Sequence, residues 1–184
     1  MTGPIRGFMT IVGLAALTCA LTACDSSLGG NPTPASPSGS APSSAPTSQT
    51  DTPLAGTSPC KTLDQALAGQ GFPPATPSTA DLEHACDTQK EGAGVFSLGL
   101  QDGEAYDTSI ANPAKATPGS VRARRAILER EPTQQTGVCA VSVEVKPKSR
   151  ATIAVSFAQG TTDEACTEAR TLASAVELLL PRNS

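Results

Sequence analysis

Six cysteines constrain the fold of this 184-residue chain more than any other feature. Cys19 and Cys24 lie in an apolar run near the N-terminus, and the other four are Cys60, Cys86, Cys139 and Cys166. Zinc sites usually take cysteines from close C-x(2–4)-C pairs, whereas these four stand 26, 53 and 27 positions apart. An even number of cysteines in a secreted domain indicates disulfides. The four therefore predict a domain with two disulfides.

The N-terminal segment predicts export and lipid attachment. Arg6 is the one charge before an uncharged, mostly apolar run from Gly7 to Ala23, which is short for a membrane-spanning helix and typical of a secretory signal. Residues 21–24, LTAC, resemble the bacterial lipobox, which implies cleavage before Cys24 and diacylglycerol on its thiol. We expect residues 1–23 to be a lipoprotein signal peptide and the mature protein to be lipid-anchored on the outer face of the cell membrane. The alternatives are an uncleaved anchor helix and an ordinary cleavage site beside a chance cysteine.

Residues 24–58 predict a disordered tether between the lipid and a folded domain. Ser, Pro, Thr, Gly and Ala fill 28 of the 34 positions from 25 to 58, and only Leu28 and Leu54 are large and apolar. Such a segment buries too little apolar surface to offset its conformational entropy. The Ser/Thr-Pro composition also raises the hypothesis of O-glycosylation.

Residues 59–184 predict an α+β domain with an antiparallel sheet of about five strands and two helices packed on one face. A helix begins near Pro59 and stops at Gly69 and Gly71, and a second begins with the capping box of Thr161 and Glu164 and ends at Pro181. Between them, alternating apolar residues predict half-buried strands. The strand segments are 82–88, 95–101, 122–131, 138–145 and 151–157, of which 122–131 alternates least clearly. Residues 102–120 are expected to form a long loop.

The expected elements suggest a disulfide connectivity. Cys86 and Cys139 lie on the apolar faces of their strands, and Cys60 and Cys166 lie at the starts of the two helices. We predict that the two cysteines at the helix starts pair with each other, as Cys60–Cys166, and that the two strand cysteines pair as Cys86–Cys139.

The whole layout resembles a known family. The chain has a lipobox, a Ser/Pro/Thr tether, PCKTL opening a helix, HAC on a strand, GVCAVSVEV, and a closing DEACTEARTLASAVELLLP. This order of features resembles that of the actinobacterial lipoproteins grouped as domain of unknown function 3558. The resemblance covers roughly residues 59–181 and supports the expected location and fold, and it implies no activity. The family often places Trp two residues after the second cysteine, where this chain has Thr88, so no role of that Trp is transferred.

Composition argues against a nucleic-acid partner. The net charge is −4, aromatic residues make up 3% of the chain, and Trp is absent. Such a chain lacks the basic surface and the stacking rings of nucleic-acid binders. The partners we expect are the membrane, through the lipid, and a wall component, a lipid or a membrane protein.

Residues suited to catalysis or metal binding are few. His84 is the single histidine, and its place beside a predicted disulfide favours a structural role. Asp102, Glu104 and Asp107 offer oxygen ligands for calcium, although solvated loop carboxylates are commoner. We predict no catalytic residues, metal ligands or cofactor.

A set of cations suggests one positive surface. If the strand assignments hold, these side chains face anionic lipid headgroups or wall polymers; a solvated sheet face is the alternative. The set is Arg122, Arg124, Arg125, Lys146, Lys148 and Arg150.

Two functions fit these observations. The favoured one is a non-catalytic binding or adaptor module at the cell envelope. The alternative is a secreted envelope hydrolase with an unrecognised site. Two carboxylates with raised pKa in one cavity would favour the hydrolase, and an open groove would favour the binding module.

Overall fold

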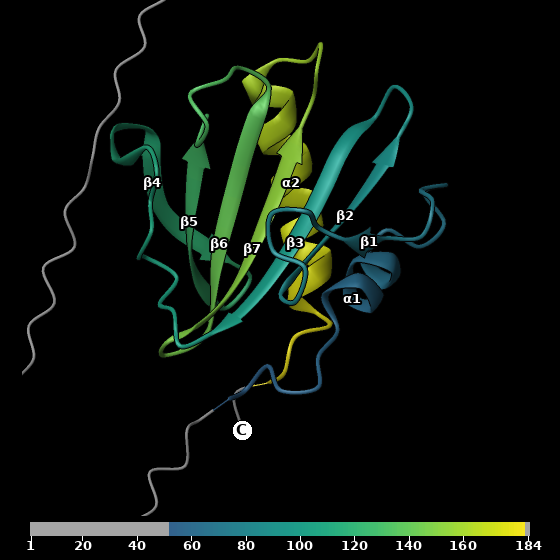
Figure 1. Cartoon of the computed structure of the whole chain (residues 1–184). Coiled ribbons are helices and arrows are strands. Elements are labelled where there is room, and N and C mark those ends of the chain that lie inside the picture. The colour runs from purple at the N-terminus through teal and green to yellow at the C-terminus, as the bar shows by residue number, and fades with distance from the viewer. Residues whose placement is uncertain (1–51, 183–184) are drawn as a thin grey trace, which may run out of the picture. The chain divides into compact units, whose positions relative to one another are not determined.

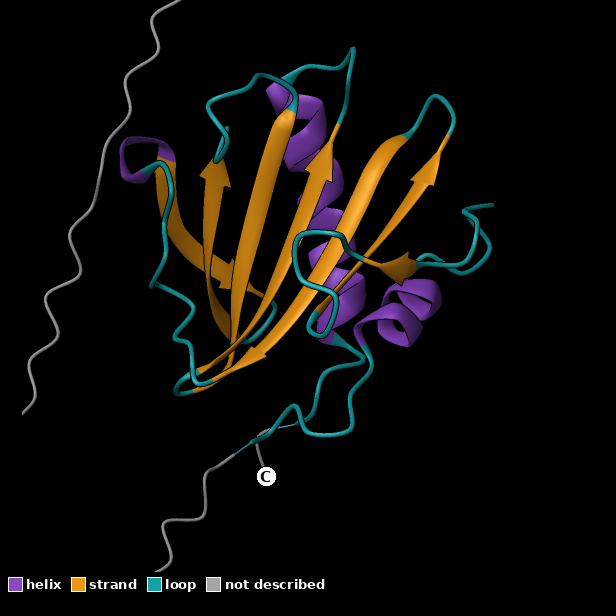
Figure 2. Cartoon of the chain, viewed as in Figure 1, coloured by secondary structure: helices purple, strands orange, loops and turns teal. Residues whose placement is uncertain are grey.

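The computed structural model of the chain describes residues 52–182 as two helices packed on a seven-stranded sheet (Figures 1 and 2). Every neighbouring pair of strands is antiparallel, so the predicted α+β class is confirmed. The helices are α1 (Pro59–Ala66), the short 3-10 helix η1 (Pro113–Lys115) and α2 (Thr162–Glu177). The strands are β1 (Thr76–Pro77), β2 (Ala85–Lys90), β3 (Gly94–Asp102), β4 (Ala116–Val121), β5 (Arg124–Arg130), β6 (Val138–Lys146) and β7 (Ser149–Ser156).

The sheet order is β1-β2-β3-β7-β6-β5-β4, which gives two more strands than predicted. The added strands are β1, of two residues, and β4, which begins inside the predicted loop 102–120 and ends one residue beyond it. β4 contains Pro118 and Gly119 and has one buried residue, Val121, so it lacks the alternation that marks a strand. It is an edge strand, where proline is tolerated because one side of the backbone needs no partner.

Both helices begin with side-chain caps. The Ser58 side chain accepts from the Lys61 N–H ahead of α1. The predicted capping box of α2 is confirmed, because the Thr161 hydroxyl accepts from the Glu164 N–H and the Glu164 carboxylate accepts from the Thr161 N–H. α2 ends at Glu177, four residues before Pro181.

The core lies between one face of the sheet and the two helices. Leu98 of β3 pairs with Cys86 of β2 on one side and with Ile153 of β7 on the other. Ile153 pairs in turn with Val141 of β6. These side chains share a face because alternate residues of a strand point the same way. Leu63 of α1 and a buried stripe on α2 cover them; the stripe is Ala165, Cys166, Ala169, Leu172, Ala173 and Val176.

The two disulfides join each helix to the sheet, and the predicted pairing is wrong. The bonds are Cys60–Cys86 and Cys139–Cys166. Cys86 and Cys139 do share the core face, but β3 and β7 lie between their strands. At about 4.8 Å per strand, they are roughly 14 Å apart, beyond the reach of a disulfide. Each therefore bonds to the helix that covers its own strand.

The ordered domain begins earlier than predicted. Leu54, assigned to the tether, is buried in the core, and its N–H donates to Asp102 (3.3 Å). A single apolar residue was too weak a signal in a Pro/Ser-rich segment. The predicted signal peptide, the predicted lipidation site Cys24 and residues 24–51 of the predicted tether lie outside the described residues. Within residues 52–182, no helix has the length and apolar character needed to span a membrane.

Candidate binding surface on the open face of the sheet

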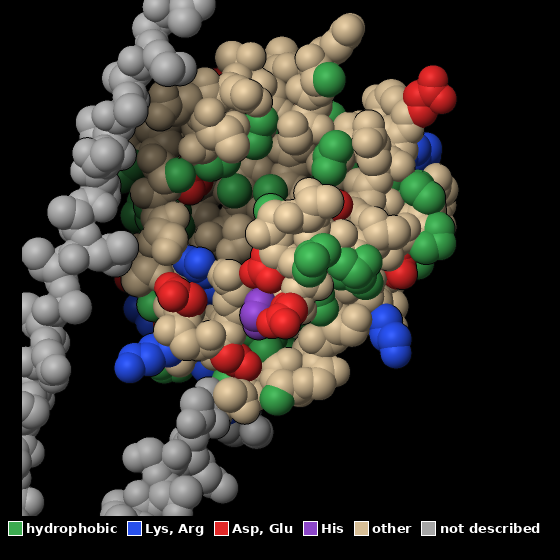
Figure 3. Space-filling view, viewed as in Figure 1, with side chains coloured by type: hydrophobic (Ala, Val, Ile, Leu, Met, Phe, Trp, Pro, Cys, Tyr) green, Lys and Arg blue, Asp and Glu red, His purple; other side chains and the backbone are tan. Residues whose placement is uncertain are grey.

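Within residues 52–182, the sheet has one face covered by the two α-helices and one face that carries no α-helix, which we call the open face. In Figure 1, α2 lies behind the strands, and the open face is toward the viewer. Figure 3 shows the same side as a space-filling surface with a hollow at its centre. The floor of this face is formed by small residues of the three central strands: Ser97, Gly99, Ala140, Ser142, Thr152 and Ala154.

The floor follows from the strand register. Gly99 pairs with Thr152, and Thr152 pairs with Ser142, so the three form one row across β3, β7 and β6. Their large apolar neighbours along each strand point to the core. The result is a shallow surface with hydroxyl groups that can donate and accept hydrogen bonds.

A row of charged residues crosses one end of the open face. Arg150 donates to Gln101 (2.9 Å) and pairs in register with Glu144. Glu144 accepts from Arg125 (2.7 Å), and this hydrogen bond raises the pKa of the Arg125 guanidinium. The row therefore presents alternating positive and negative charge rather than one sign.

The loop after β3 is fastened to this charged row. Arg150 donates to the Thr108 carbonyl (2.9 Å), and the Arg125 guanidinium lies 5.2 Å from the centre of the Tyr106 ring. Both contacts hold residues 105–108 beside the open face. Tyr106 is thereby placed as a rim residue of that face.

A turn between β1 and β2 carries the single histidine. Figure 1 shows residues 78–84 in front of the sheet. Asp81 accepts from the backbone N–H of His84 (3.0 Å) and contacts its ring nitrogen Nδ1 (3.1 Å). The backbone hydrogen bond is the main cause that holds the pKa of Asp81 below its usual range. His84 is about half exposed and belongs to this local turn, one residue before β2 begins, whereas the predicted strand 82–88 included it.

The six predicted cations do not form one surface. Arg125 and Arg150 lie on the open face, as described above. Arg124 is buried and donates to the Val145 carbonyl, and Arg122 donates to the Ser174 carbonyl on α2. Lys146 and Lys148 lie at the β6–β7 turn. Alternation along β5 divides the first group, because Arg124 and Arg125 must point to opposite faces.

The acidic set that suggested calcium binding is also dispersed. Asp102 accepts from the Ser149 hydroxyl (2.6 Å) and from the Leu54 N–H, whereas Glu104 accepts from Thr108. Among residues 52–182 there is no cluster of three His, Cys, Asp or Glu side chains arranged to hold a metal ion.

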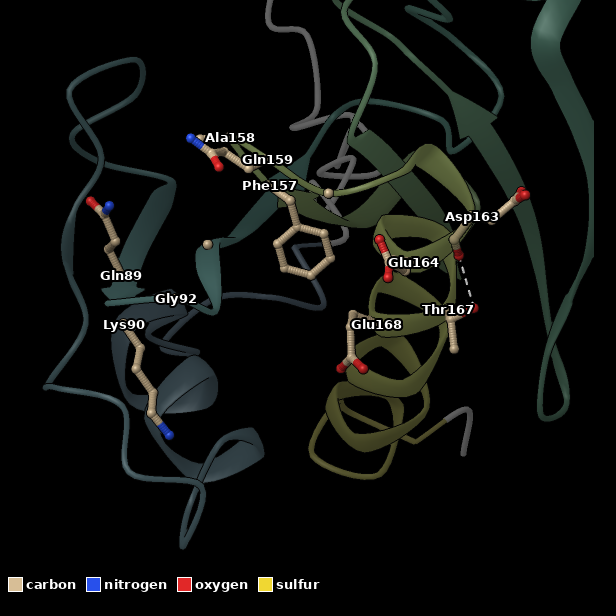
Figure 4. A pocket seen from close by; sticks show the side chains of 12 residues that line it. Gln89, Lys90, Gly92, Phe157, Ala158, Gln159, Asp163, Glu164, Thr167 and Glu168 are labelled. Carbon is tan, nitrogen blue, oxygen red and sulfur yellow. Dashed lines mark hydrogen bonds between the residues drawn. The ribbon is translucent and has the colours of Figure 1, made fainter.

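A separate groove of about 800 Å³ lies where the β2–β3 hairpin meets the start of α2. Figure 4 shows the Phe157 ring between the hairpin and the carboxylates of Glu164 and Glu168. Phe157 also packs against Phe96, with ring centres 6.3 Å apart. Sequence reasoning missed this groove because its walls come from segments about seventy positions apart along the chain.

Two of the groove carboxylates are engaged in contacts within the domain. Glu164 caps α2, and the hydrogen bond from the Thr161 N–H holds the pKa of its carboxyl below the usual range. Asp163 is paired with Arg130 (2.7 Å). An acid that acts near neutral pH requires a raised pKa, so Glu164 is not suited to that role, and the groove presents an acidic wall.

The structure thus defines a disulfide-bonded α+β domain with one helix-covered and one open sheet face. The family model described as Protein of unknown function (DUF3558) matches residues 19–178, and the chain belongs to that family. The predicted family is therefore confirmed. No curated protein and no solved structure matches the chain.

Proposed function

We propose that this protein is a lipoprotein, anchored through Cys24 on the outer face of the cell membrane, whose domain is a non-catalytic binding or adaptor module for an envelope protein. The observation that carries the proposal is the open face. A seven-stranded sheet with one face free of helices and a hollowed floor of small polar residues presents a broad surface to a partner.

The chemistry of the open face favours a protein partner. The row of Gln101, Arg150, Glu144 and Arg125 offers charges of both signs. Complementary charges of both signs are typical of protein interfaces, whereas a uniformly anionic polymer or lipid surface would complement only the arginines of this row. The floor hydroxyls add hydrogen-bonding groups without bulk.

The hydrolase alternative has less support. His84 is engaged with Asp81 in a local turn, and the pKa of Glu164 in the groove is lowered. Neither arrangement supplies an activated nucleophile or a general acid.

Site-specific photocrosslinking in cells tests the open face. A photoreactive phenylalanine analogue at Ser142, in the floor, is compared with the same analogue at Thr171, exposed on α2. We expect a discrete protein adduct from position 142 and none from position 171. Adducts of equal yield from both positions, or an adduct that contains only glycan or lipid, would contradict a protein partner on this face.

Anchoring is tested with Cys24→Ala in the full chain. We expect the variant to leave the membrane fraction while the two disulfides of the domain stay intact. A variant that stays in the membrane after alkaline extraction would show an uncleaved anchor helix instead.

A further inference from the structure

One end of the domain gathers exposed leucines and cations, and we call it the basal end. It consists of the end of α2, the β4–β5 turn and the β6–β7 turn, with the residues Leu178, Leu179, Arg122, Lys146 and Lys148. Figure 1 shows that α2 ends where the described chain enters the domain.

Hydrogen bonds fix the entering chain to this end. The Leu54 N–H donates to Asp102, which also accepts from Ser149 (2.6 Å). The Gly103 N–H donates to the carbonyl of Lys148 (2.7 Å). The segment that leads back to Cys24 therefore joins the domain beside the β6–β7 turn.

The apolar part of the basal end is a pair of adjacent leucines. The exposed fraction is 56% for Leu178 and 39% for Leu179. They follow the last turn of α2 and lie between the buried Val176 and the buried Leu180. Adjacent exposed leucines are costly in water and gain free energy at an apolar boundary.

The cations of the basal end are available to an external anion. Lys146 and Lys148 take part in none of the ion pairs found among residues 52–182. Arg122 is about half exposed and lies 3.7 Å from Glu177.

Two carboxylates on the elements of the basal end already have partners. Arg124 donates to Glu177 (3.1 Å), and Arg125 donates to Glu144 (2.7 Å). The free charge on the β6–β7 turn itself is therefore positive, on a chain whose net charge is −4. The exposed carboxylates of residues 104–107 lie in the adjoining loop.

Two of these cations occupy left-handed backbone positions. The φ angle is 51° at Arg122 and 60° at Lys148, a region that glycine enters without steric cost. These are angles of tight turns, which hold both side chains at the ends of their hairpins; Ser109, Glu131 and Gln134 have the same conformation elsewhere.

We propose that the basal end docks on anionic phospholipids of the membrane that holds the anchor, with Leu178 and Leu179 at the acyl boundary and the three cations at the headgroups. The inference rests on the proposed lipid anchoring at Cys24. A short tether alone leaves a domain free to rotate, whereas this second contact orients it. Leucines and cations together are the combination that binds anionic interfaces.

Fluorescence of the acylated full chain in vesicles tests the docking. The chain has no Trp, so Leu178→Trp supplies a single reporter, and Thr171→Trp on the exposed side of α2 is the matched control. We expect blue-shifted Trp emission from position 178 in vesicles of phosphatidylglycerol and phosphatidylcholine. The shift should be lost in phosphatidylcholine alone and weakened by high salt.

Charge substitutions measure the contribution of the lysines. Each lysine near an anionic surface strengthens binding about five-fold, so Lys146→Gln with Lys148→Gln should lower the docking equilibrium about 25-fold. Lys61→Gln with Arg170→Gln removes the same charge from exposed positions elsewhere and should leave it unchanged. Equal effects of the two pairs would overturn the proposal.

The outcomes separate docking from anchoring. If the wild-type chain fails to stay with vesicles of either composition after extraction, anchoring has failed. If it stays with the vesicles but the Leu178→Trp variant emits at the same wavelength as the Thr171→Trp variant, the docking proposal is overturned and anchoring stands. If Leu178→Trp disturbs the circular dichroism of the fold, Leu179→Trp is the second reporter.

Discussion

Arg124 joins three segments that are far apart along the chain. Its guanidinium donates to the carbonyl of Val145 (2.7 Å), to the carboxylate of Glu177 (3.1 Å) and to the carbonyl of Pro181 (2.5 Å). Only 7% of the residue is exposed. Arg124 was predicted to face an external anion, but its side chain is buried and hydrogen-bonds β5 to β6 and to the end of α2.

Replacement of Arg124 by Ala is expected to lower the free energy of unfolding by about 3–5 kcal/mol, because Glu177 and two carbonyls lose a buried partner. Urea denaturation followed by circular dichroism measures the change. Arg122→Ala, which removes a half-exposed side chain 3.7 Å from the same Glu177, should change the free energy of unfolding by less than about 1 kcal/mol. Equal small effects of the two substitutions would show that the Arg124 contacts do not stabilise the fold.

Glu131 makes the free energy of unfolding of the domain depend on pH in the acidic range. The hydrogen bond from Lys115, and next that from Thr162, hold the pKa of the Glu131 carboxyl below its usual range. A carboxyl with a lower pKa in the folded state stabilises the fold above its unfolded pKa, and this contribution is lost as the pH falls through the folded pKa.

Glu131→Gln should therefore be less stable than wild type near pH 7, with the difference shrinking below about pH 4. Denaturation midpoints measured across this range give the comparison. The exposed Glu91→Gln serves as the reference, and a Glu131 difference that stays constant down to low pH would contradict the assignment.

At the scale of elements, each helix is held to the sheet by one disulfide. The bridged residues are 26 and 27 positions apart, and loops of that length correspond to about 3.5 kcal/mol each in the chain-entropy model.

The double substitution Cys139→Ser with Cys166→Ser should lower the free energy of unfolding by about that amount and leave Cys60–Cys86 intact. Peptide mapping without reduction checks the connectivity directly. A peptide that joins Cys60 to Cys166 would disprove the pairing described here.

Sequence periodicity predicted the elements that bury an apolar face. The capping box at Thr161 predicted the start of α2, and the alternation of apolar and polar residues predicted β6 and β7. β4 was not predicted, because an edge strand with Pro118 buries too little to show a pattern. The disulfide connectivity was not predictable because it depends on which strands are neighbours in the sheet, and β3 pairs with β7 rather than with the next strand along the chain.

At the scale of the whole molecule, the domain extends toward the N-terminus as far as Leu54. Leu54 is 6% exposed and belongs to the core. Leu54→Ala should lower the free energy of unfolding by about 2–4 kcal/mol, as for other buried leucines. Thermal denaturation measures the change.

Leu82, which is 69% exposed, is the matched control for Leu54. Leu82→Ala should change the free energy of unfolding by less than about 0.5 kcal/mol. If the two alanine variants unfold at the same temperature as wild type, the boundary belongs after residue 58.

The open face could be predicted only in part. Ala140, Ser142 and Glu144 alternate with the apolar residues of β6, so the sequence indicated a polar face for that strand. Their meeting with Ser97, Gly99 and Thr152 depends on the order of the strands. The basal end could not be predicted from the sequence, because Leu178 was assigned to a helix expected to continue to Pro181.

The junction between β3 and β7 divides the domain into two parts with separate covalent bonds. One part, from α1 to β3, contains Cys60–Cys86, and the other, from β4 to α2, contains Cys139–Cys166. The two parts are held together by the ladder from Val95–Ser156 to Asp102–Ser149 and by the packing of α1 and α2 in the shared core. A protease cut between residues 104 and 111 would therefore yield two oxidised fragments with no bond between them. Because each fragment keeps its own disulfide and the two share one β-ladder, we expect them to reassociate on mixing into a noncovalent domain.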